Sequence, residues 1–574
     1  FVLSSDSLDR IAPIEPARME NRTVIPWDKD DLDDLGFFKV DVLGLGMLTA
    51  IRKSLAFLHQ ESEGNLDSFD PIEAMARVPP EDEKVYDAIC DADTVGVFQI
   101  ESRAQMSMLP RLKPRTFYDL VVEVAIVRPG PIQGGMVHPY LRRREGKESK
   151  APPHPCLAPI LDRTLGVPLF QEQVMQIAMV GADYTPGEAD QLRRDMAAWK
   201  RNGRLERHRE RLLAGFRRNG ISPKFAEALY RQIQGFGEYG FPESHAASFA
   251  VLVYVSAWLK VYHPAEFACA LLNSQPMGFY SASSIVQDAQ RHDVVVEPVC
   301  VLRSRWDNTL DYDGSVSESQ SPTTEPEPGP VGHHVNKVPP RLRLGFRQVK
   351  GLSQSAGESI EKAREQGPFT SVQDFVSRTN LPRNEVEALA EAGAFDVLSP
   401  ARREAMWRAR APKGDGLFRS VALEQERQIG LPGLHPTQQL TLDYARVGLS
   451  VNDHPMRHLR ADMNKLRVQR ALDLRAMSAG DRVRVAGLVI GRQRPETTSG
   501  VTFMTLEDET GTMNLIVHKR VFDEHYQVAR HSELLLVNGK VERDGAVIHV
   551  LAAQFRRLAL PSGDKLAARS RDFH

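Results

Sequence analysis

The part of the chain that decides its fold reads GVPLFQEQVMQIAMVGADYTPGEADQLRRDMAAWKR over residues 166–201 and GFGEYGFPESHAASFAVLVYVSAWLKVY over residues 235–262. The first stretch opens a cationic run on predicted helix, because residues 193–220 hold ten Lys or Arg and only three Asp or Glu. The second places a glycine-rich aromatic loop before Glu243, where the pattern predicts a capped helix start with small and hydroxyl side chains. A phosphate-rich partner that comes close to the backbone fits both features.

Each of these features also has a purely structural interpretation. Arginine-rich helices are commonly solvated surfaces, and the adjacent Arg193 and Arg194 point in different directions around a helix axis. His245 taken alone is more typical of a structural histidine than of a catalyst. The glycine-rich loop is not a phosphate-binding P-loop, because no Lys-Ser/Thr pair follows a glycine at the required spacing. The residues on their own therefore leave both interpretations open.

Length and composition set the class of protein. A chain of 574 residues is too long for one hydrophobic core and predicts three to five domains. Its four cysteines stand far apart without a CxxC pair, which argues against a structural zinc site and suits a reducing cytoplasm. The longest apolar run is too interrupted for a membrane span, so we expect a cytoplasmic protein with no membrane partner.

A predicted strand over residues 37–45 carries a carboxylate. Its apolar pattern is interrupted by Lys39 and Asp41, which lie on the same face of a strand because they are two residues apart. A carboxylate at the end of a buried strand is a common way to present a metal ligand. The same aspartate could instead cap the following helix, which needs no metal.

Several long motifs occur in one order along the chain: FFKVDVLGLGMLTAIRK (37–53), TVGVFQIES (94–102), RPGP (128–131), LFQEQVM (169–175) and LRR (192–194). In this order they resemble the C-family bacterial DNA polymerases, the DNA polymerase III alpha-subunit type. The segments MAAWKR, FPESHAASFAVLVYVSAWLK and the terminal RDFH look most like the error-prone DnaE-like branch of that family. The resemblance covers nearly the whole chain and corresponds to roughly the C-terminal half of the family's architecture.

The resemblance implies a nucleotidyl-transfer site with two divalent metal ions, Mg²⁺. It makes Asp41 the third catalytic carboxylate and a metal ligand, with Lys39 beside it. It also implies that Arg193 and Arg194 hold the triphosphate of the incoming dNTP. The other residues that it places at the nucleotide-binding pocket are Tyr239, Ser244 and His245.

The family's closely spaced pair of catalytic aspartates has no counterpart upstream of Asp41. Downstream of Asp41, two Asp-x-Asp patterns lie at residues 91–93 and 311–313. The first lies where the family's fingers begin and the second borders a linker, so we assign the pair to neither. The chain, which begins at Phe1 within a predicted strand, is therefore expected to be a C-terminal fragment that lacks the pair and is inactive by itself.

Residues 311–338 are rich in Ser, Pro, Thr and Glu, cannot bury a core, and are expected to form a disordered linker. Residues 339–400 predict tandem helix-hairpin-helix units. The first hairpin contains Lys350 and Gly351, and such turns aim backbone N–H groups at one DNA phosphate. An ordinary helical hairpin is the alternative. Residues 401–476 predict a helical connector.

Five short predicted strands, with a helix between the third and the fourth, indicate an OB-fold barrel over residues 477–560, followed by a tail over 561–574. OB barrels commonly bind single strands through aromatic stacking and cationic grooves. We expect a DNA-binding face that includes Arg492, Arg494 and Phe503. Many OB folds bind proteins instead, and that alternative stays open.

The expected fold is therefore multidomain α+β: part of a polymerase palm (1–60), mostly helical fingers (61–310), a helix-hairpin-helix domain and a C-terminal OB-fold β-barrel. The expected function is template-directed, error-prone DNA synthesis in DNA damage tolerance, acting on primer-template DNA and dNTPs. The resemblance also implies contacts with the sliding clamp and with accessory proteins of a mutagenesis cassette. The alternatives are a non-catalytic DNA-binding protein anchored at primer-template junctions and a polymerase-derived scaffold.

Overall fold

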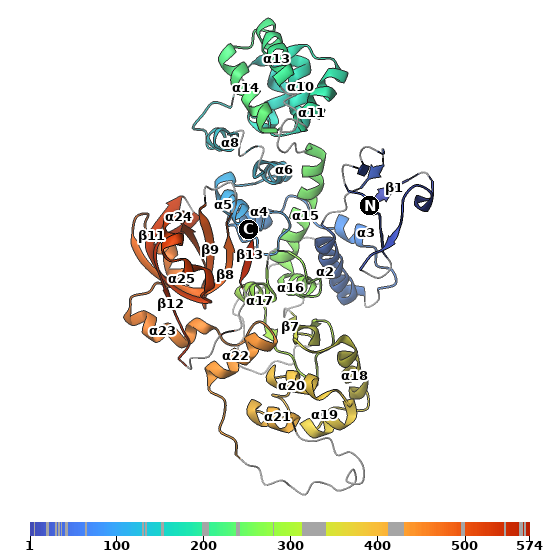
Figure 1. The fold of residues 1–574 in the computed structure, drawn as a ribbon, viewed down its shortest axis with the longest axis vertical. Coiled ribbons are helices and arrows are strands. Elements are labelled where there is room, and N and C mark those ends of the chain that lie inside the picture. Colours follow the sequence, from blue (N-terminus) through green and yellow to red (C-terminus); the bar gives the residue numbers. More distant parts are fainter. Residues whose placement is uncertain are drawn as a thin grey trace.

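The structure is a computed structural model. It describes residues 1–574 except 5, 19–21, 29–30, 33–34, 36, 41–43, 64–65, 129–130, 132–134, 151–153, 198–205, 237–241, 279, 313–339, 411–429, 495–499, 545–546, 562–565, 567–569 and 574. Figure 1 shows one helical group at the top, a second at the bottom and a β-barrel at one side. The long helix α15 (Glu243–Tyr262) runs between them.

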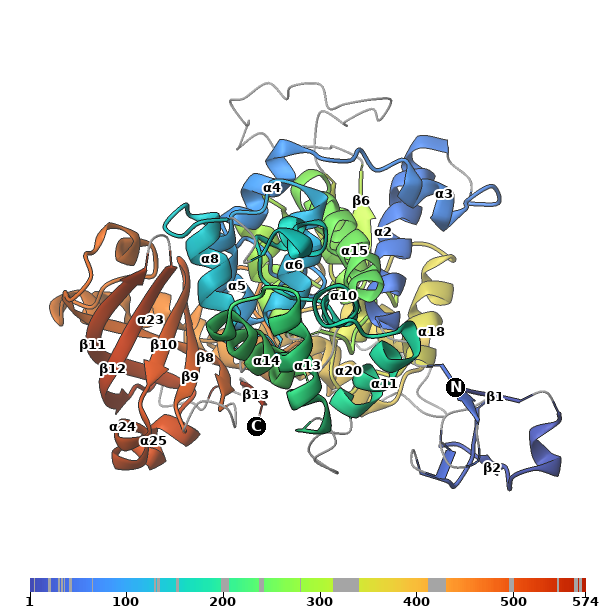
Figure 2. The ribbon, with the colours of Figure 1, turned by 90° about the horizontal axis from the view of Figure 1, so that it is seen from above.

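Two short antiparallel pairs of strands form the N-terminal region. Strand β1 (Val2–Leu3) pairs with β4 (Phe38–Lys39), and β2 (Glu15–Pro16) pairs with β3 (Thr23–Val24). The following helices are α2 (Leu45–Glu63) and α3 (Pro71–Ala76). The strand predicted over residues 37–45 is thus shorter than expected, because α2 already begins at Leu45. Figure 2 shows β1 and β2 standing apart from the central helices.

The fingers are helical, as predicted. Their helices after α3 are α4 (Glu83–Cys90), α5 (Arg103–Leu112), α6 (Phe117–Ile126), α8 (Val137–Arg144), α9 (Ala158–Leu161), α10 (Gln171–Ala182), α11 (Pro186–Ala197), α13 (Glu206–Arg218), α14 (Pro223–Phe236), α15, α16 (Pro264–Leu272) and α17 (Ala282–Arg291). Single turns of 3-10 helix, η1 to η4 and η6, cover Leu8–Arg10, Pro155–Leu157, Asp162–Thr164, Phe346–Gln348 and Leu472–Ala476.

Helix α15 is the central element of the fingers. It packs against α2, α4, α6 and α16, and every residue from Val253 to Lys260 is buried. Burial all around a helix is typical of a core position. By length and composition α15 is the one described helix that could cross a membrane, and 56% of its apolar window is buried inside the protein.

A small sheet leads from the fingers to the second helical group. Its order is β5 (Val296–Glu297), β7 (Arg341–Arg343) and β6 (Thr309–Asp311), with β5 parallel and β6 antiparallel to β7. The helices that follow are α18 (Gln354–Arg364), α19 (Val372–Thr379), α20 (Arg383–Glu391), α21 (Arg402–Ala409), α22 (Pro436–Arg446) and α23 (Pro455–Lys465). The predicted linker thus connects β6 to β7, and most of it lies outside the described residues. One continuous apolar core extends from α2 through the fingers to α21.

The C-terminal region is a closed barrel, as predicted. Its strands are β8 (Arg482–Gln493), β9 (Thr502–Asp508), β10 (Gly511–Val517), β11 (Leu534–Asp544) and β12 (Val547–Arg557). They are joined in the order β11-β12-β10-β9-β8, and β8 closes the barrel by pairing with β11. The predicted single helix after the third strand is two short ones, α24 (Lys519–Glu524) and α25 (Tyr526–His531). The end of the predicted tail forms β13 (Arg571–Phe573), which runs parallel to β8.

Candidate active site and nucleic-acid surfaces

The predicted catalytic strand pairs with strand β1. The Phe1 amino group donates to the Val40 carbonyl at 2.8 Å, and the Val40 N–H donates back to Phe1 at 2.8 Å. Asp41, the predicted metal ligand, follows directly but lies outside the described residues. The backbone of Lys39 ends β4. The structure therefore describes the strand that leads to Asp41, but the Asp41 carboxylate is not among the described atoms.

A glycine turn connects this strand to the fingers core. Gly44 has a φ of +72°, and a Cβ there would lie 3.3 Å from the ring of Phe98. At Gly46 a Cβ would approach the Cβ of Met277 to 2.9 Å. Side chains larger than hydrogen would push the start of α2 away from both contacts, so glycine at these two positions lets α2 begin directly against Phe98 and Met277.

An aromatic row extends from this turn to α15. The rings of Phe98 and Phe249 are 5.1 Å apart at 74°, and the rings of Phe249 and His245 are 4.1 Å apart. Burial and the nearby Arg128 cation both lower the pKa of His245, so its imidazole is neutral at pH 7. The predicted nucleotide-site residue His245 thus lies at one end of a row whose other end lies against Gly44, three residues after Asp41 in the sequence.

Arg128, from the RPGP motif, lies beside this row. Its guanidinium donates through Nη2 to Gln99 Oε1 at 2.7 Å and through Nε to the Val124 carbonyl at 3.1 Å. Gln99 has a φ of +60°, a conformation that non-glycine residues rarely adopt. Gln99, the neighbour of Phe98 in the chain, and Arg128 are therefore hydrogen-bond partners, and each fixes the position of the other.

The start of α15 is capped differently from the prediction. Its N-cap is Pro242, which has no side-chain hydrogen bond. Instead the Glu172 carboxylate, on α10, accepts from the Glu243 N–H at 3.0 Å, and Glu243 accepts from the Tyr118 hydroxyl at 2.8 Å. These contacts tie the upper helical group to α15. Ser244 is exposed on the first turn, and Tyr239 lies outside the described residues.

Arg193 and Arg194 lie on α11, and one carboxylate holds both. Asp190 accepts from Arg193 Nη2 at 2.9 Å and from Arg194 Nη2 at 2.6 Å. The side chains keep 40% and 66% of their accessible surface. Asp190 thus gathers two guanidinium groups that adjacent helix positions would otherwise separate, and it leaves one net positive charge on an exposed surface.

Comparison with known proteins identifies the family. Profiles match the bacterial DNA polymerase III alpha NTPase domain over residues 1–44, its finger domain over 47–220, a helix-hairpin-helix motif over 293–405 and an OB-fold nucleic acid binding domain over 483–558. A Pseudomonas fluorescens protein named error-prone DNA polymerase is 51% identical over 575 residues, covering 100% of this chain and 53% of that protein. The chain belongs to the bacterial DNA polymerase III alpha family.

Two further relatives carry the same name. The protein of Methylococcus capsulatus is 49% identical over 581 residues, and that of Anaeromyxobacter dehalogenans is 48% identical over 578 residues. Each alignment covers 100% of this chain and 54% or 49% of the relative. The chain thus spans about half the length of the curated relatives it matches.

DNA polymerases of this family generally use divalent metal ions. Among the described residues, one group has ligands close enough for such an ion, namely Asp93, Asp288 and His292. The buried Lys260 ammonium lies 2.9 Å from Asp93 and 2.8 Å from Asp288, so an internal cation already compensates both carboxylates. This group of described residues therefore does not fit a metal site.

The hairpin predicted to contact DNA is a tight turn on the connector. Gly351 has a φ of +92°, which suits a helix-hairpin-helix turn. The Lys350 N–H donates to the Arg446 carbonyl at 2.7 Å, and its Nζ lies 3.4 Å from the Tyr444 carbonyl. The Lys350 amide is therefore used inside the protein. A DNA contact through Gly351 or the exposed Lys350 side chain stays a prediction.

The three residues of the predicted DNA-binding face of the barrel differ in their exposure to solvent. Arg492 is buried and donates to the carbonyls of Ala529 and Ser532, so the expectation that it contacts DNA is corrected to an internal role. Arg494 is exposed, 5.9 Å above the ring of Phe522. Phe503 is half-buried by the fingers. A surface contact is available to Arg494 and not to Arg492.

The cover over Phe503 is Arg103, at the start of α5. Its guanidinium lies 5.6 Å from the Phe503 ring centroid and donates to the Thr505 hydroxyl and, at 3.5 Å, to the Leu515 carbonyl. Burial lowers the pKa of Arg103 to about 10, so it stays charged at pH 7. The face of β9 and β10, where OB folds usually bind oligonucleotides, is here a docking surface for the fingers.

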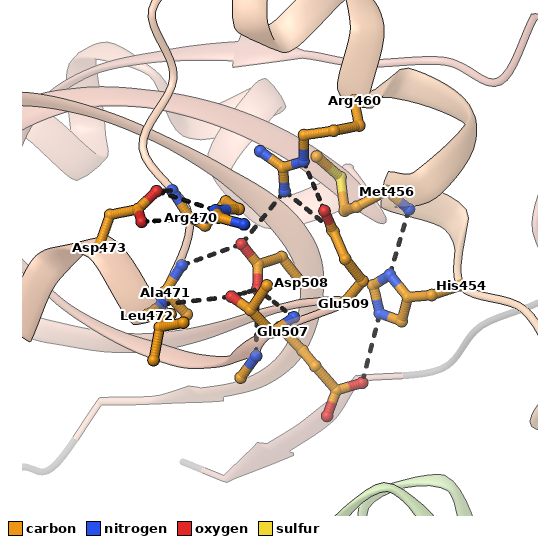
Figure 3. A network of polar contacts seen from close by, with 12 residues as sticks. His454, Met456, Arg460, Arg470, Ala471, Leu472, Asp473, Glu507, Asp508 and Glu509 are labelled. Carbon is orange, nitrogen blue, oxygen red and sulfur yellow. Dashed lines mark hydrogen bonds and ion pairs between the residues drawn. The ribbon is translucent and has the colours of Figure 1, made fainter. Parts of the chain in front are cut away.

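A buried polar network attaches the barrel to the connector (Figure 3). Arg460, on α23, donates to Glu509 at 2.5 Å and to Asp508 at 3.2 Å, at the turn after β9. His454 Nε2 lies 3.7 Å from the carboxylate of Glu507, and both side chains are almost fully buried. Apart from the turn itself, no local sequence pattern indicates this network, because its members come from distant segments.

Proposed function

We propose that the chain supports template-directed, error-prone DNA synthesis in DNA damage tolerance, on primer-template DNA with dNTPs. The observation that carries this proposal is the aromatic row, which links the turn after Asp41 to His245 across some two hundred positions of sequence. A metal ligand and a nucleotide site must be neighbours for nucleotidyl transfer. The names of the relatives point to the same activity.

Asp41 would supply one carboxylate for Mg²⁺, with Lys39 beside it, and the remaining carboxylates would come from outside this chain. The bound ions would activate the primer hydroxyl and stabilise the triphosphate. The chain's own residues would position the nucleotide. Arg193 and Arg194 would exchange Asp190 for triphosphate oxygens, which hold guanidinium groups in the same bidentate way.

The other residues proposed for the nucleotide site are Tyr239, Ser244 and His245. Because the His245 imidazole is neutral at pH 7, it can donate or accept one hydrogen bond without adding charge to the site. Arg128, held by Gln99, would supply a fixed positive charge beside His245. We propose that this pair keeps His245 neutral and orients Phe98 under the nucleotide.

Nucleic acid would reach this site over the exposed hairpin at Gly351 and the barrel residue Arg494. The proposed setting is the cytoplasm, where the sliding clamp and mutagenesis-cassette proteins would be the partners. These partners rest on the resemblance to the family alone.

Primer extension tests the proposal. The chain is assayed with Mg²⁺ and four dNTPs, alone and joined to the preceding segment of the Pseudomonas fluorescens relative. We expect extension from the joined protein only, and its loss in Asp41→Ala. Extension by the chain alone would contradict the missing pair of aspartates. No extension by either form, with DNA binding intact, would support the non-catalytic alternative.

A further inference from the structure

Two hydrogen bonds and an ion pair meet at Glu243, where α15 begins below the upper helical group. This group comprises the elements from η2 to α14, at the top of Figure 1. The Glu243 N–H donates to Glu172 Oε2, on α10, at 3.0 Å, and its carboxylate accepts from the Tyr118 hydroxyl at 2.8 Å. Glu243 therefore connects three helices, because its backbone binds α10 and its side chain binds α6.

A fourth residue completes this set of contacts. Arg163, on η3 of the upper group, lies 4.0 Å from the centre of the Tyr118 ring, and its Nη1 is 3.8 Å from Glu243 Oε1. Burial and the hydrogen bond to Glu243 raise the pKa of Tyr118, so its hydroxyl keeps its proton and stays a donor at pH 7. Tyr118, Arg163, Glu172 and Glu243 together form the α15 junction.

The proposed nucleotide site is divided between the two elements that the α15 junction connects. Ser244 and His245 directly follow Glu243 on the first turn of α15. Arg193 and Arg194 lie on α11, which packs against α10. A nucleotide that binds the arginines through its triphosphate and also reaches His245 requires α10 and α15 to keep one relative position.

The α15 junction is polar and partly open to water. Glu243 keeps 33% of its side-chain surface and Arg163 keeps 69%. Exposed ion pairs contribute little to stability, so the fold of this region rests on its continuous apolar core instead. Hydrogen bonds are directional, however, and they fix the angle at which two packed elements meet. Loss of the junction should therefore change the position of α11 relative to α15 more than it changes stability.

We propose that Glu243 is a positioning residue, which sets the position of the triphosphate-binding arginines relative to His245 through Tyr118, Arg163 and Glu172. This inference rests on the proposed function, because it assigns the nucleotide to both sides of the α15 junction. Glu243 acts through the residues that it holds and not on the nucleotide itself.

Steady-state primer extension by the joined polymerase tests the inference. We expect Glu243→Ala to raise the dNTP KM about tenfold and to change kcat by less than about twofold, as for binding energy that the ground state and the transition state share. Glu243→Gln keeps an oxygen that accepts from Tyr118, and should return the KM to within about threefold of the parent value. Glu227→Ala is the matched control and should leave the KM unchanged, since Glu227 also pairs with an arginine but lies within the upper group.

A double variant tests whether the effect passes through the hydrogen bond. Tyr118→Phe removes the donor and leaves the ring in place. If both changes act through this contact, Tyr118→Phe combined with Glu243→Ala should raise the KM no more than Glu243→Ala alone. Additive increases, or a KM that Glu243→Ala leaves unchanged, would overturn the inference. So would a fall in kcat at constant KM, because Glu243 would then act in the transition state.

Hydrogen exchange of this chain without dNTP separates the inference from the proposed function. Glu172→Ala and Glu243→Ala should each accelerate exchange in the first two turns of α15 about tenfold and leave α17 unchanged. If the joined parent extends no primer, the proposed function fails, and accelerated exchange would still show that Glu243 connects α10 to α15. If the parent extends primers but neither the KM nor the exchange responds, the positioning role is wrong and the proposed function stands.

Discussion

Two arginine settings in this molecule look alike in sequence and differ in structure. Arg193 and Arg194 on α11 keep 40% and 66% of their side-chain surface and share one exposed carboxylate. Arg492 on β8 keeps 6% and is bound by two backbone carbonyls and the Ser570 hydroxyl. The first pair can exchange its partner for a ligand, while the second is part of the barrel.

The two settings differ in the groups that lose a partner when the arginine moves to a ligand. When a phosphate displaces Asp190 from its arginines, the carboxylate returns to water at little cost, since exposed ion pairs contribute about 0–1 kcal/mol. When Arg492 leaves its carbonyls, buried acceptors lose their donors. Exposure and the kind of partner, rather than charge, therefore separate ligand-binding cations from structural ones. Lys260 belongs to the structural class.

The largest expected effect comes from Lys260→Met. This change removes the buried cation shared by the partly exposed Asp93 and the more deeply buried Asp288, and it leaves the partly exposed His292 as their neighbouring histidine. Removing one partner of a fully buried pair costs about 3–5 kcal/mol, which is the upper limit here. Hydrogen exchange followed by mass spectrometry should show more than about 100-fold faster exchange in α15 and α17. Lys84→Met, at an exposed position of α4, is the control and should leave exchange unchanged.

A compensating variant sharpens this test. In the triple variant, Asp93→Asn and Asp288→Asn are combined with Lys260→Met, so no carboxylate is left without its cation. This variant should restore much of the protection of α15 and α17 against hydrogen exchange. If the amides of Lys260→Met exchange as slowly as those of the parent protein, Lys260 is not a structural cation.

Arg492→Ala is expected to cost about 3 kcal/mol, because three hydrogen bonds from a charged donor are lost in a buried setting. Exchange of the β8 and β11 amides should accelerate about 100-fold, with the fingers unaffected. Arg494→Ala, two residues away but exposed, should change barrel stability by less than about 0.5 kcal/mol. If Arg492→Ala keeps the stability of the barrel but loses DNA affinity, Arg492 is a ligand-binding cation and not a structural one.

The barrel shows how much of the fold the sequence could predict. Alternating apolar residues predict all five strands. One face of each strand fills the core, so every second residue is apolar and the alternation is visible in the sequence. The setting of Arg492 could not be predicted. A β-bulge between Val489 and Gly491 shifts the register of β8, and a one-residue shift moves every later side chain to the other face.

The candidate site shows a similar division. Ordered motifs indicate the family, and with it Arg193, Arg194 and His245, because these motifs are long and local. The contact of Arg103 with Phe503 joins segments four hundred residues apart, and nothing near either residue signals it. Asp41 and Tyr239 lie outside the described residues, so their placement stays a prediction.

A smaller effect is expected on α11, where the comparison predicts a change in ligand binding without a change in stability. In the joined polymerase, Arg194→Ala should raise the dNTP KM about 10- to 100-fold, as expected for loss of a charge-assisted hydrogen bond to the triphosphate. Arg218→Ala is the matched control, since that arginine is exposed and also paired to an aspartate, Asp183. An equal KM in both variants would contradict the nucleotide role of α11.

The smallest expected effect is on pH dependence, and it comes from a partly exposed member of the Lys260 cluster. The hydrogen bond with Asp93 raises the pKa of His292 despite the opposing effect of burial. Asp288 also faces His292 and raises its pKa, and Asp288 is itself paired with Arg291. A raised folded-state pKa favours the protonated histidine. The stabilisation is therefore complete below the unfolded value of about 6.5 and is lost as pH rises through the folded value.

Urea unfolding followed by tryptophan fluorescence measures this effect, since Trp258 lies on α15 close to the cluster. We expect the midpoint to fall between about pH 6 and pH 9, and the fall to be smaller in His292→Asn, which keeps a polar side chain without the titration. Asp93 does not titrate in this window. Burial raises its pKa, but His292 and Lys260 together outweigh burial and lower the pKa, so the carboxylate stays ionised. If the parent protein and His292→Asn have the same pH profile, Lys260 alone compensates the charge of Asp93, and protonation of His292 adds no stability.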